Sequence, residues 1–227
     1  MTTTLAGAIE SGRVEDITRS VIETFQRAKS MRAWANEALA PALHALREGY
    51  EGQKWWYPDL VQREMALLEG MRLCEREVSS AEQESSPVVV VATMKGEPYR
   101  GGKDVYANAL SAFGLRVVDA GVHRTPQQLT QAVLDSQADA LCICMFASLP
   151  SAVMLAGKIP GWLAATAWGK TTKTVLAGYG ANRQLSTELG FDGYAGDGAE
   201  AARVVQDLCR EGTPQQDEGE GASAWVQ

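Results

Sequence analysis

The spacing of apolar residues changes once along the chain, near residue 80. Before that point they recur every three to four residues, which is typical of amphipathic helices that pack against each other. From Pro87 onward, short β-branched runs alternate with helical stretches, beginning with the four valines at 88–91. A run that is apolar at every position predicts a parallel strand buried on both faces. The sequence therefore predicts a helical unit followed by an α/β unit.

The pattern predicts four helices in the first unit and five strand-plus-helix pairs in the second. The helices of the first unit are expected at 5–10, 14–29, 32–48 and 57–75. The strands are expected at 88–92, 115–119, 138–145, 174–177 and 192–195, and the helices that follow them at 102–113, 126–136, 149–167, 182–189 and 198–210. Repeated βα units imply parallel strands joined by right-handed crossovers. We therefore expect a flavodoxin-like or Rossmann-like sheet of five parallel strands, with ligands at the carboxyl ends of its strands.

The same change of pattern sets the expected domain limits. We place a helical bundle at 1–78 and the α/β domain at 88–211. Between them, residues 79–87 are rich in serine and glutamate and end at a proline, which is typical of a linker. The glycine- and glutamine-rich stretch at 212–227 is predicted to be a disordered tail.

Charge and cysteine usage exclude several classes of function. The chain carries 28 acidic and 21 basic residues, a formal net charge of −7, which disfavours direct binding to nucleic acid or to anionic membranes. No stretch reaches the roughly 18 apolar residues of a membrane-spanning helix, and no signal peptide is evident. The four cysteines are too scattered for a disulfide framework. We expect a cytoplasmic protein whose partners are small molecules or other proteins.

Several stretches resemble one known family over nearly the whole chain. They are EALAPAL at 37–43 and YPDL at 57–60 in the helical unit, TMKGEPYRGGK at 93–103 after the first strand, DAGV at 119–122 with TPQQL at 125–129, and FDGYA at 191–195 with AEA at 199–201. This combination is similar to the cobalamin (vitamin B12)-binding modules of methionine synthase and of methyltransferase corrinoid proteins. The resemblance implies a helical cap over a Rossmann-like cobalamin-binding domain, and cobalamin as the cofactor.

The loop at 93–103 departs from the family's DxHxxG motif at two positions. In the family, the histidine becomes the lower ligand of cobalt and the aspartate supports it. Here Glu97 and Tyr99 occupy those positions, and Arg100 follows Tyr99. Gly102 and Lys103 fit the family's pattern. A tyrosine has a pKa near 10 and stays protonated at neutral pH, so it is a poor cobalt ligand. We therefore expect cobalamin to bind without the usual histidine.

The resemblance places the cofactor's nucleotide tail beside the third and fourth strands. The family's serine and leucine positions correspond to Cys144 and Phe146, and its paired glycines become Gly178 and Gly180 with Tyr179 between them. A thiol is a weaker hydrogen-bonding group than a hydroxyl, and Tyr179 adds bulk. These changes predict a tail-binding slot that is partly closed.

Four further residues are candidates for the cofactor site. His123 follows the second expected strand and is a candidate ligand for cobalt or iron, although a solvent-exposed loop residue is the simpler interpretation. Trp55, Trp56 and Tyr57 form an aromatic run before a helix. They form either a seal between the two units or a wall for a large planar ligand.

Alternative functions remain open at this point. The first interpretation is a methyl-group carrier for a methyltransferase partner. Others are a cobalamin- or haem-based light or redox sensor acting on a regulatory protein, a ligand-free interaction module, and a phosphate binder. In a haem site, Lys95, Arg100 and Lys103 could pair with propionates. The loops show no catalytic constellation, and the lower ligand, the methyl donor and a homodimer all remain undecided.

Overall fold

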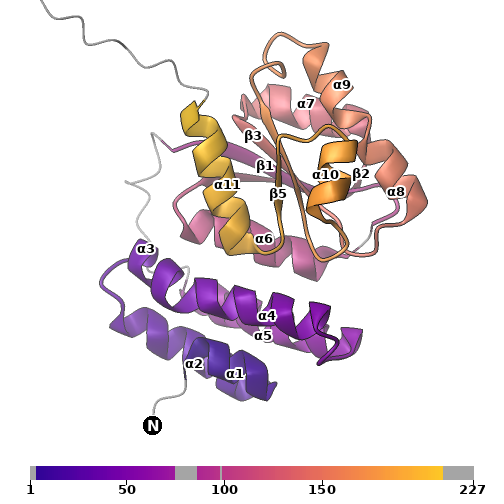
Figure 1. Cartoon of the computed structure of the whole chain (residues 1–227). Coiled ribbons are helices and arrows are strands. Elements are labelled where there is room, and N and C mark those ends of the chain that lie inside the picture. Colours follow the sequence, from indigo (N-terminus) through magenta and orange to yellow (C-terminus); the bar gives the residue numbers. More distant parts are fainter. Residues whose placement is uncertain (1–3, 75–85, 98, 212–227) are drawn as a thin grey trace, which may run out of the picture.

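A computed structural model describes residues 4–74, 86–97 and 99–211 (Figure 1). The predicted linker lies mostly outside these residues, and the predicted tail lies outside them entirely. The first unit contains α1 (Leu5–Ser11), α2 (Val14–Arg27), α3 (Met31–Trp34), the π-helical turn η1 (Ala35–Leu39), α4 (Ala40–Glu51) and α5 (Tyr57–Cys74). We call this unit the cap.

The third predicted helix is divided by a π turn. Pro41 has no backbone N–H, so it cannot form the usual bond to the carbonyl four residues earlier. Immediately before it the helix widens, and the N–H of Ala40 bonds to the carbonyl of Ala35, five residues earlier. The apolar residues Leu39, Leu43 and Leu46 are nevertheless all buried.

The second unit is a five-stranded, all-parallel sheet with the order β2-β1-β3-β4-β5. Its strands are β1 (Val88–Met94), β2 (Arg116–Arg124), β3 (Ala140–Cys144), β4 (Lys173–Ala177) and β5 (Gly193–Ala195). The helices are α6 (Arg100–Ala112), α7 (Pro126–Ser136), α8 (Pro150–Ala156), α9 (Ile159–Ala164), α10 (Arg183–Glu188) and α11 (Gly198–Glu211). The predicted fold class, a helical bundle followed by a flavodoxin-like sheet, is confirmed.

Two further predicted elements differ clearly from the structure. The helix expected at 149–167 is two short helices, α8 and α9, separated around Gly157. Pro160 lies in the first turn of α9, where its missing N–H costs nothing, and it could not continue α8. Strand β2 extends to Arg124 rather than ending at 119, because two register shifts in its pairing with β1 let the two strands stay together.

The longer β2 includes His123. We expected it to follow the second strand, but it lies inside β2, the edge strand of the sheet. Its φ of 61° belongs to the left-handed region, and Gly121 also has a positive φ of 87°. These two residues lie where β2 is shifted in register against β1.

Side chains alternate along β1 between two cores. Val89 and Val91 face a core formed with α6, α11 and the cap, whereas Val90, Ala92 and Met94 face a second core. The helices α7, α8, α9 and α10 supply side chains to that second core. The cap therefore covers only one side of the α/β domain.

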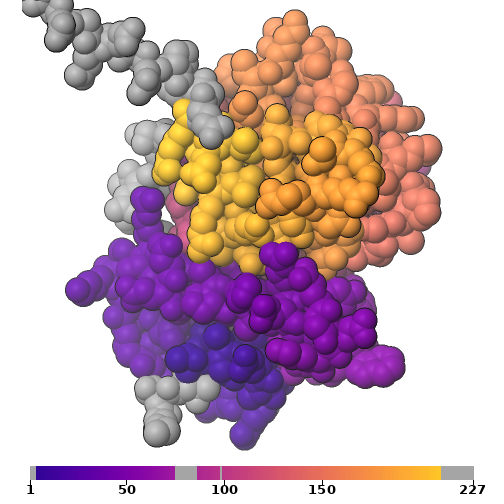
Figure 2. Space-filling model, in the orientation of Figure 1, coloured from indigo at the N-terminus to yellow at the C-terminus, as the bar shows by residue number. Residues whose placement is uncertain are grey.

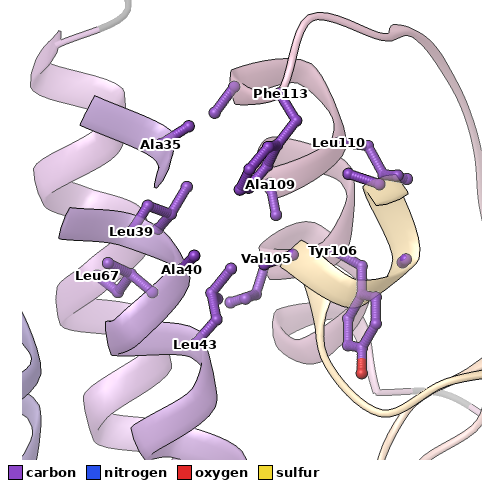
Figure 3. Close-up of a cluster of buried hydrophobic side chains, with 14 of the residues drawn as sticks. Ala35, Leu39, Ala40, Leu43, Leu67, Val105, Tyr106, Ala109, Leu110 and Phe113 are labelled. Atoms are coloured by element: carbon purple, nitrogen blue, oxygen red, sulfur yellow. The ribbon is translucent and has the colours of Figure 1, made fainter. Parts of the chain in front are cut away.

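The cap and the α/β domain share one continuous apolar core. Leu39 and Leu43 of the cap point toward Val105 and Ala109 of α6 (Figure 3). Leu67 of α5 belongs to this core, whereas Met65 of the same helix is 55% exposed and does not. The space-filling view shows the cap and the α/β domain in contact along a broad boundary (Figure 2).

An ion pair also joins the two units. The guanidinium of Arg47 on α4 lies 2.9 Å from the carboxylate of Glu200 on α11, and that carboxylate also accepts a 2.7 Å bond from the N–H of Gly196. The side chains of Arg47 and Glu200 are 25% and 31% exposed. Arg47 pairs with Glu51 as well.

Replacing Glu200 with glutamine should lower the free energy of unfolding by about 1 kcal/mol or less, because the pair is near the surface and Glu51 remains beside Arg47. Urea unfolding of the variant and the wild type would measure this change in the free energy of unfolding. The control is Asp207→Asn, which removes the exposed partner of Arg210 on the same helix and should change nothing measurable. An equal loss in both variants would contradict a specific contribution from the cap contact.

Among the described residues, no helix has both the length and the apolar character needed to cross a bilayer.

Candidate functional site

Three loops meet the cap at the carboxyl edge of the sheet. They follow β1, β3 and β4, and in doubly wound folds such loops bind ligands. The loops after β1 and β3 are tied by Glu97, whose carboxylate accepts bonds from the N–H groups of Phe146 (3.2 Å) and Ala147 (2.9 Å). The hydroxyl of Thr93 donates to the carbonyl of Glu97. Glu97 is only 1% exposed, so in this structure it organises the loops.

A buried carboxyl group connects the cap to two of these loops. Glu64 on α5 is fully buried and accepts hydrogen bonds from the hydroxyls of Tyr99, in the loop after β1, and Tyr179, in the loop after β4. The Tyr179 bond measures 3.2 Å. We call these three residues the Glu64 cluster. It holds the cap against the edge where the sequence predicts a ligand.

Burial controls the protonation of the Glu64 cluster. It raises the pKa of Glu64 from 4.5 to about 7, although the bonds from Tyr99 and Tyr179 oppose part of that rise. Burial also raises the pKa of Tyr99, and the neighbouring carboxyl of Glu64 raises it further. Tyr99 therefore remains a protonated phenol that donates to Glu64, and the phenolate that could bind a metal is disfavoured.

Aromatic rings fill the space between the cap and the strand ends. The aromatic series consists of five rings in contact, with centroid distances from 5.2 to 5.9 Å. In order, its members are Tyr57, Tyr99, Phe146, Tyr179 and Tyr50. Tyr106 of α6 also contacts Phe146, and its hydroxyl bonds to the carbonyl of Gly196. A planar ligand could enter this space only if the rings and the cap moved apart.

The predicted aromatic run lies at the edge of this filled space. Trp55 is partly buried and its ring lies 4.2 Å from the guanidinium carbon of Arg63. Trp56 is 83% exposed, and Tyr57, at the end of the aromatic series, is 46% exposed. The run therefore both seals the interface, through Tyr57, and presents an open aromatic surface, through Trp56.

The predicted glycines allow close approach between loops. A Cβ on Gly178 would lie 2.2 Å from the carbonyl oxygen of Met145, and one on Gly180 would lie 2.7 Å from the carbonyl of Phe146. A Cβ on Gly102 would lie 2.5 Å from the ring of Phe146. These positions are glycine in this structure because the protein itself occupies the neighbouring space.

The basic residues and His123 lie apart from the aromatic series. Lys103 is fully buried, and its ammonium nitrogen lies 2.6 Å from carboxylates of both Asp104 and Asp119. Arg100 is exposed and lines a pocket of about 630 Å³ between α5 and α6. The exposed His123 accepts a 3.2 Å bond at Nδ1 from the N–H of Gly96.

Cys144 lies inside the sheet rather than in a ligand pocket. It is completely buried in β3, and burial, together with the thiol of Cys142, raises its pKa well above the ordinary value. It therefore remains a protonated thiol. Within the described part of the chain, no three histidine, cysteine or acidic side chains come together as a metal-binding group.

Sequence reasoning missed Glu64, although a signal was present. Leu60, Glu64, Leu67 and Met71 have the spacing of one helix face, and all four are buried. An acid on an otherwise apolar stripe indicates a buried carboxyl that needs partners. Tyr50 and Tyr106 were also missed, because aromatic residues on predicted helices are usually core residues.

Comparisons with known proteins address the fold as a whole. No family model matches the chain, and no curated protein sequence matches it. Among solved structures, a novel cobalamin-binding protein from Desulfitobacterium hafniense is similar, with a TM-score of 0.61 and 17% identity over 90% of this chain and 96% of that chain. The monomethylamine corrinoid protein of Methanosarcina barkeri gives a TM-score of 0.64 and 17% identity, with the same coverage.

The chain has the fold of the corrinoid proteins. A chain of the methanol:cobalamin methyltransferase complex from Methanosarcina barkeri also shares the corrinoid-protein fold, with a TM-score of 0.54 and 19% identity over 91% of this chain and 78% of that chain. These similarities extend over the cap and the α/β domain together. The order of cap and domain predicted from the sequence agrees with this corrinoid-protein fold.

Proposed function

We propose that this chain is a corrinoid-binding protein that carries a methyl group for a methyltransferase partner. The observation that carries the proposal is a helical cap held by Glu64 over the carboxyl edge of a β2-β1-β3-β4-β5 sheet. The proposal is supported by the solved structures described as a cobalamin-binding protein and a corrinoid protein, which are similar in fold over 90% of this chain.

The residues at the interface suit a large planar ligand once the cap has moved. Separating α5 from the loops breaks the Glu64 cluster and frees the ring faces of Tyr99 and Phe146. Trp56 and Tyr57 would then cover the outer side of the ligand and exclude water. When bound, the corrinoid supplies a cobalt centre that accepts and transfers a methyl group, and this chain supplies the enclosure.

The residues present do not supply the usual histidine below the metal. Tyr99 donates to Glu64 and stays protonated. His123, on the edge strand, already uses Nδ1 to accept from Gly96. We therefore propose that the corrinoid is held without an imidazole from position 99.

The region proposed for the nucleotide tail is occupied by side chains. Phe146 contacts the rings of Tyr106 and Tyr179, and Cys144 is buried behind them. The tail therefore has no room in the closed protein, which supports binding of a corrinoid whose own base or a water lies below the metal.

Purified full-length protein is expected to retain stoichiometric corrinoid after mixing with hydroxocobalamin or methylcobalamin in the dark and removal of free ligand. The absorption spectrum should show the bands of a cofactor with either its own base or a water below the metal. Tyr99→Phe should bind with the same spectrum, because the phenol is not a ligand. The same experiment is carried out with haemin, which is the alternative tetrapyrrole ligand.

Each other outcome has a definite meaning. A spectrum that changes only in His123→Ala would make that histidine a metal ligand and overturn the proposed binding mode. A Soret band with haemin, and no retained corrinoid, would replace the proposal with a haem-based sensor. If the protein retains neither corrinoid nor haemin, the proposal would be replaced by a module that acts only through a protein partner.

A further inference from the structure

A surface pocket opens between the α4–α5 turn and the loop after β4. Its volume is about 650 Å³, and five of its seven lining residues are aromatic. The lining consists of Tyr50, Glu51, Gln53, Trp55, Trp56, Tyr57 and Tyr179. The pocket is present while the cap is closed, so a ligand can reach it without a corrinoid in the protein.

The pocket is backed by the aromatic series. Tyr50 and Tyr57 are the two ends of that series, and both line the pocket. Tyr50 contacts Tyr179 with their centroids 5.3 Å apart and a 42° tilt, so the rings present different orientations to the space. Rings set at angles around a hollow can surround a compact ligand, whereas a single parallel pair accepts only a flat one.

The charge around the pocket favours a cation. Glu51 is the one charged residue among the lining residues, and its carboxylate is shared with Arg47 at 2.9 Å. The chain as a whole has a formal charge of −7. Arg47 compensates part of the charge of Glu51, but it is not among the lining residues, so a ligand in the pocket meets a carboxylate and ring faces and no basic side chain of the lining.

One ring of the pocket already binds a positive group. The guanidinium carbon of Arg63 lies 4.2 Å from the centroid of Trp55, within the range of a cation–π contact. The neighbouring Trp56 is 83% exposed, and no cation–π contact is recorded for its ring among the described residues. An exposed tryptophan at the mouth of an aromatic hollow is available to cover a ligand.

We propose that this pocket binds an organic cation of the quaternary-ammonium class, surrounded by Trp56, Tyr57 and Tyr50 and balanced by Glu51. A cation whose charge is spread over methyl groups loses little hydration when it enters such a site, and it gains attraction from each ring face. A primary ammonium holds its water more strongly and should bind less well.

The test uses the full-length chain without any corrinoid, so its outcome is separate from that of the proposed function. Isothermal titration calorimetry compares choline with 3,3-dimethyl-1-butanol, which has the same shape but a carbon in place of the charged nitrogen. We expect saturable binding of choline at one site and binding of the neutral alcohol that is weaker by about tenfold or more. Equal affinities would overturn the proposal, since the pocket would then be merely apolar.

Variants locate the site. Trp56→Ala should weaken choline binding by about tenfold, and Trp56→Phe should restore part of it because a π face returns. Trp162→Ala is the matched control: Trp162 is 40% exposed on α9, in the half of the domain that does not face the cap, and its removal should leave the affinity unchanged. Unaltered binding in Trp56→Ala, or absence of saturable choline binding by the wild type, would overturn the assignment.

Discussion

Replacing Glu64 with glutamine is expected to remove a large part of the pH dependence of stability between pH 5 and pH 8. In the wild type, burial raises the pKa of Glu64 from 4.5 to about 7. Between these values the folded protein binds a proton that the unfolded chain has released, so the free energy of unfolding falls as the pH rises. The contribution of the neutral carboxyl group is fully present below pH 4.5 and is lost as the pH passes through about 7.

The expected effect amounts to about 2 to 3 kcal/mol over that range, since each pKa unit corresponds to about 1.4 kcal/mol. Glutamine is neutral at every pH and, like the protonated carboxyl group, offers one acceptor oxygen and one donor group to the hydroxyls of Tyr99 and Tyr179. The stability of the variant relative to the wild type should therefore increase as the pH rises. The quantity to measure is the difference between their free energies of unfolding. Denaturant unfolding at pH 5, 6, 7 and 8 provides it.

Glu69→Gln is the matched control, because Glu69 lies on the same helix, is exposed and pairs with Arg72. Its pKa is lowered by the hydrogen bond from Arg72, so it remains ionised throughout this pH range. The control should reproduce the wild-type pH dependence. If Glu64→Gln showed that dependence too, the Glu64 cluster would not hold a neutral carboxyl group.

Replacing Gly178 with alanine is expected to destabilise the protein by about 3 kcal/mol or more, through two separate causes. Its φ of 102° is a conformation that side chains with a Cβ rarely adopt. In addition, the new Cβ would lie 2.2 Å from the carbonyl oxygen of Met145, a backbone atom that cannot turn aside. The loops after β3 and β4 would have to separate.

Gly114→Ala isolates the first of these causes. Gly114 also has a positive φ, of 88°, but its added Cβ would meet no atom within 4 Å. Gly114→Ala should lower the free energy of unfolding by about 1 kcal/mol, which is the penalty of the left-handed conformation alone. Thermal and denaturant unfolding of both variants would separate the two causes. Equal losses would mean that the loops after β3 and β4 are not in rigid contact.

Much of the fold follows from local pattern. The four valines of β1 predict a buried parallel strand because both faces of that strand are covered, and the structure confirms it. The helix at 126–136 was predicted with its bounds correct, since Thr125 and Gln128 form a capping box at its start. Such signals act within a few residues, so the sequence alone determines the order of elements and the edge of the sheet where a site belongs.

Contacts between distant parts of the chain could not be predicted in the same way. Tyr99 and Tyr179 bond to Glu64 across 35 and 115 positions of sequence. No periodicity connects residues so far apart, and the position of the cap over the domain brings them together. Likewise, His123 lies in β2 because register shifts against β1 prolong the strand. The sequence by itself determined that position 99 is a tyrosine, where the resemblance to corrinoid modules predicts a histidine. Only the tertiary structure decided that the hydroxyl of Tyr99 is bonded to a buried acid, because burial and pairing depend on which surfaces meet.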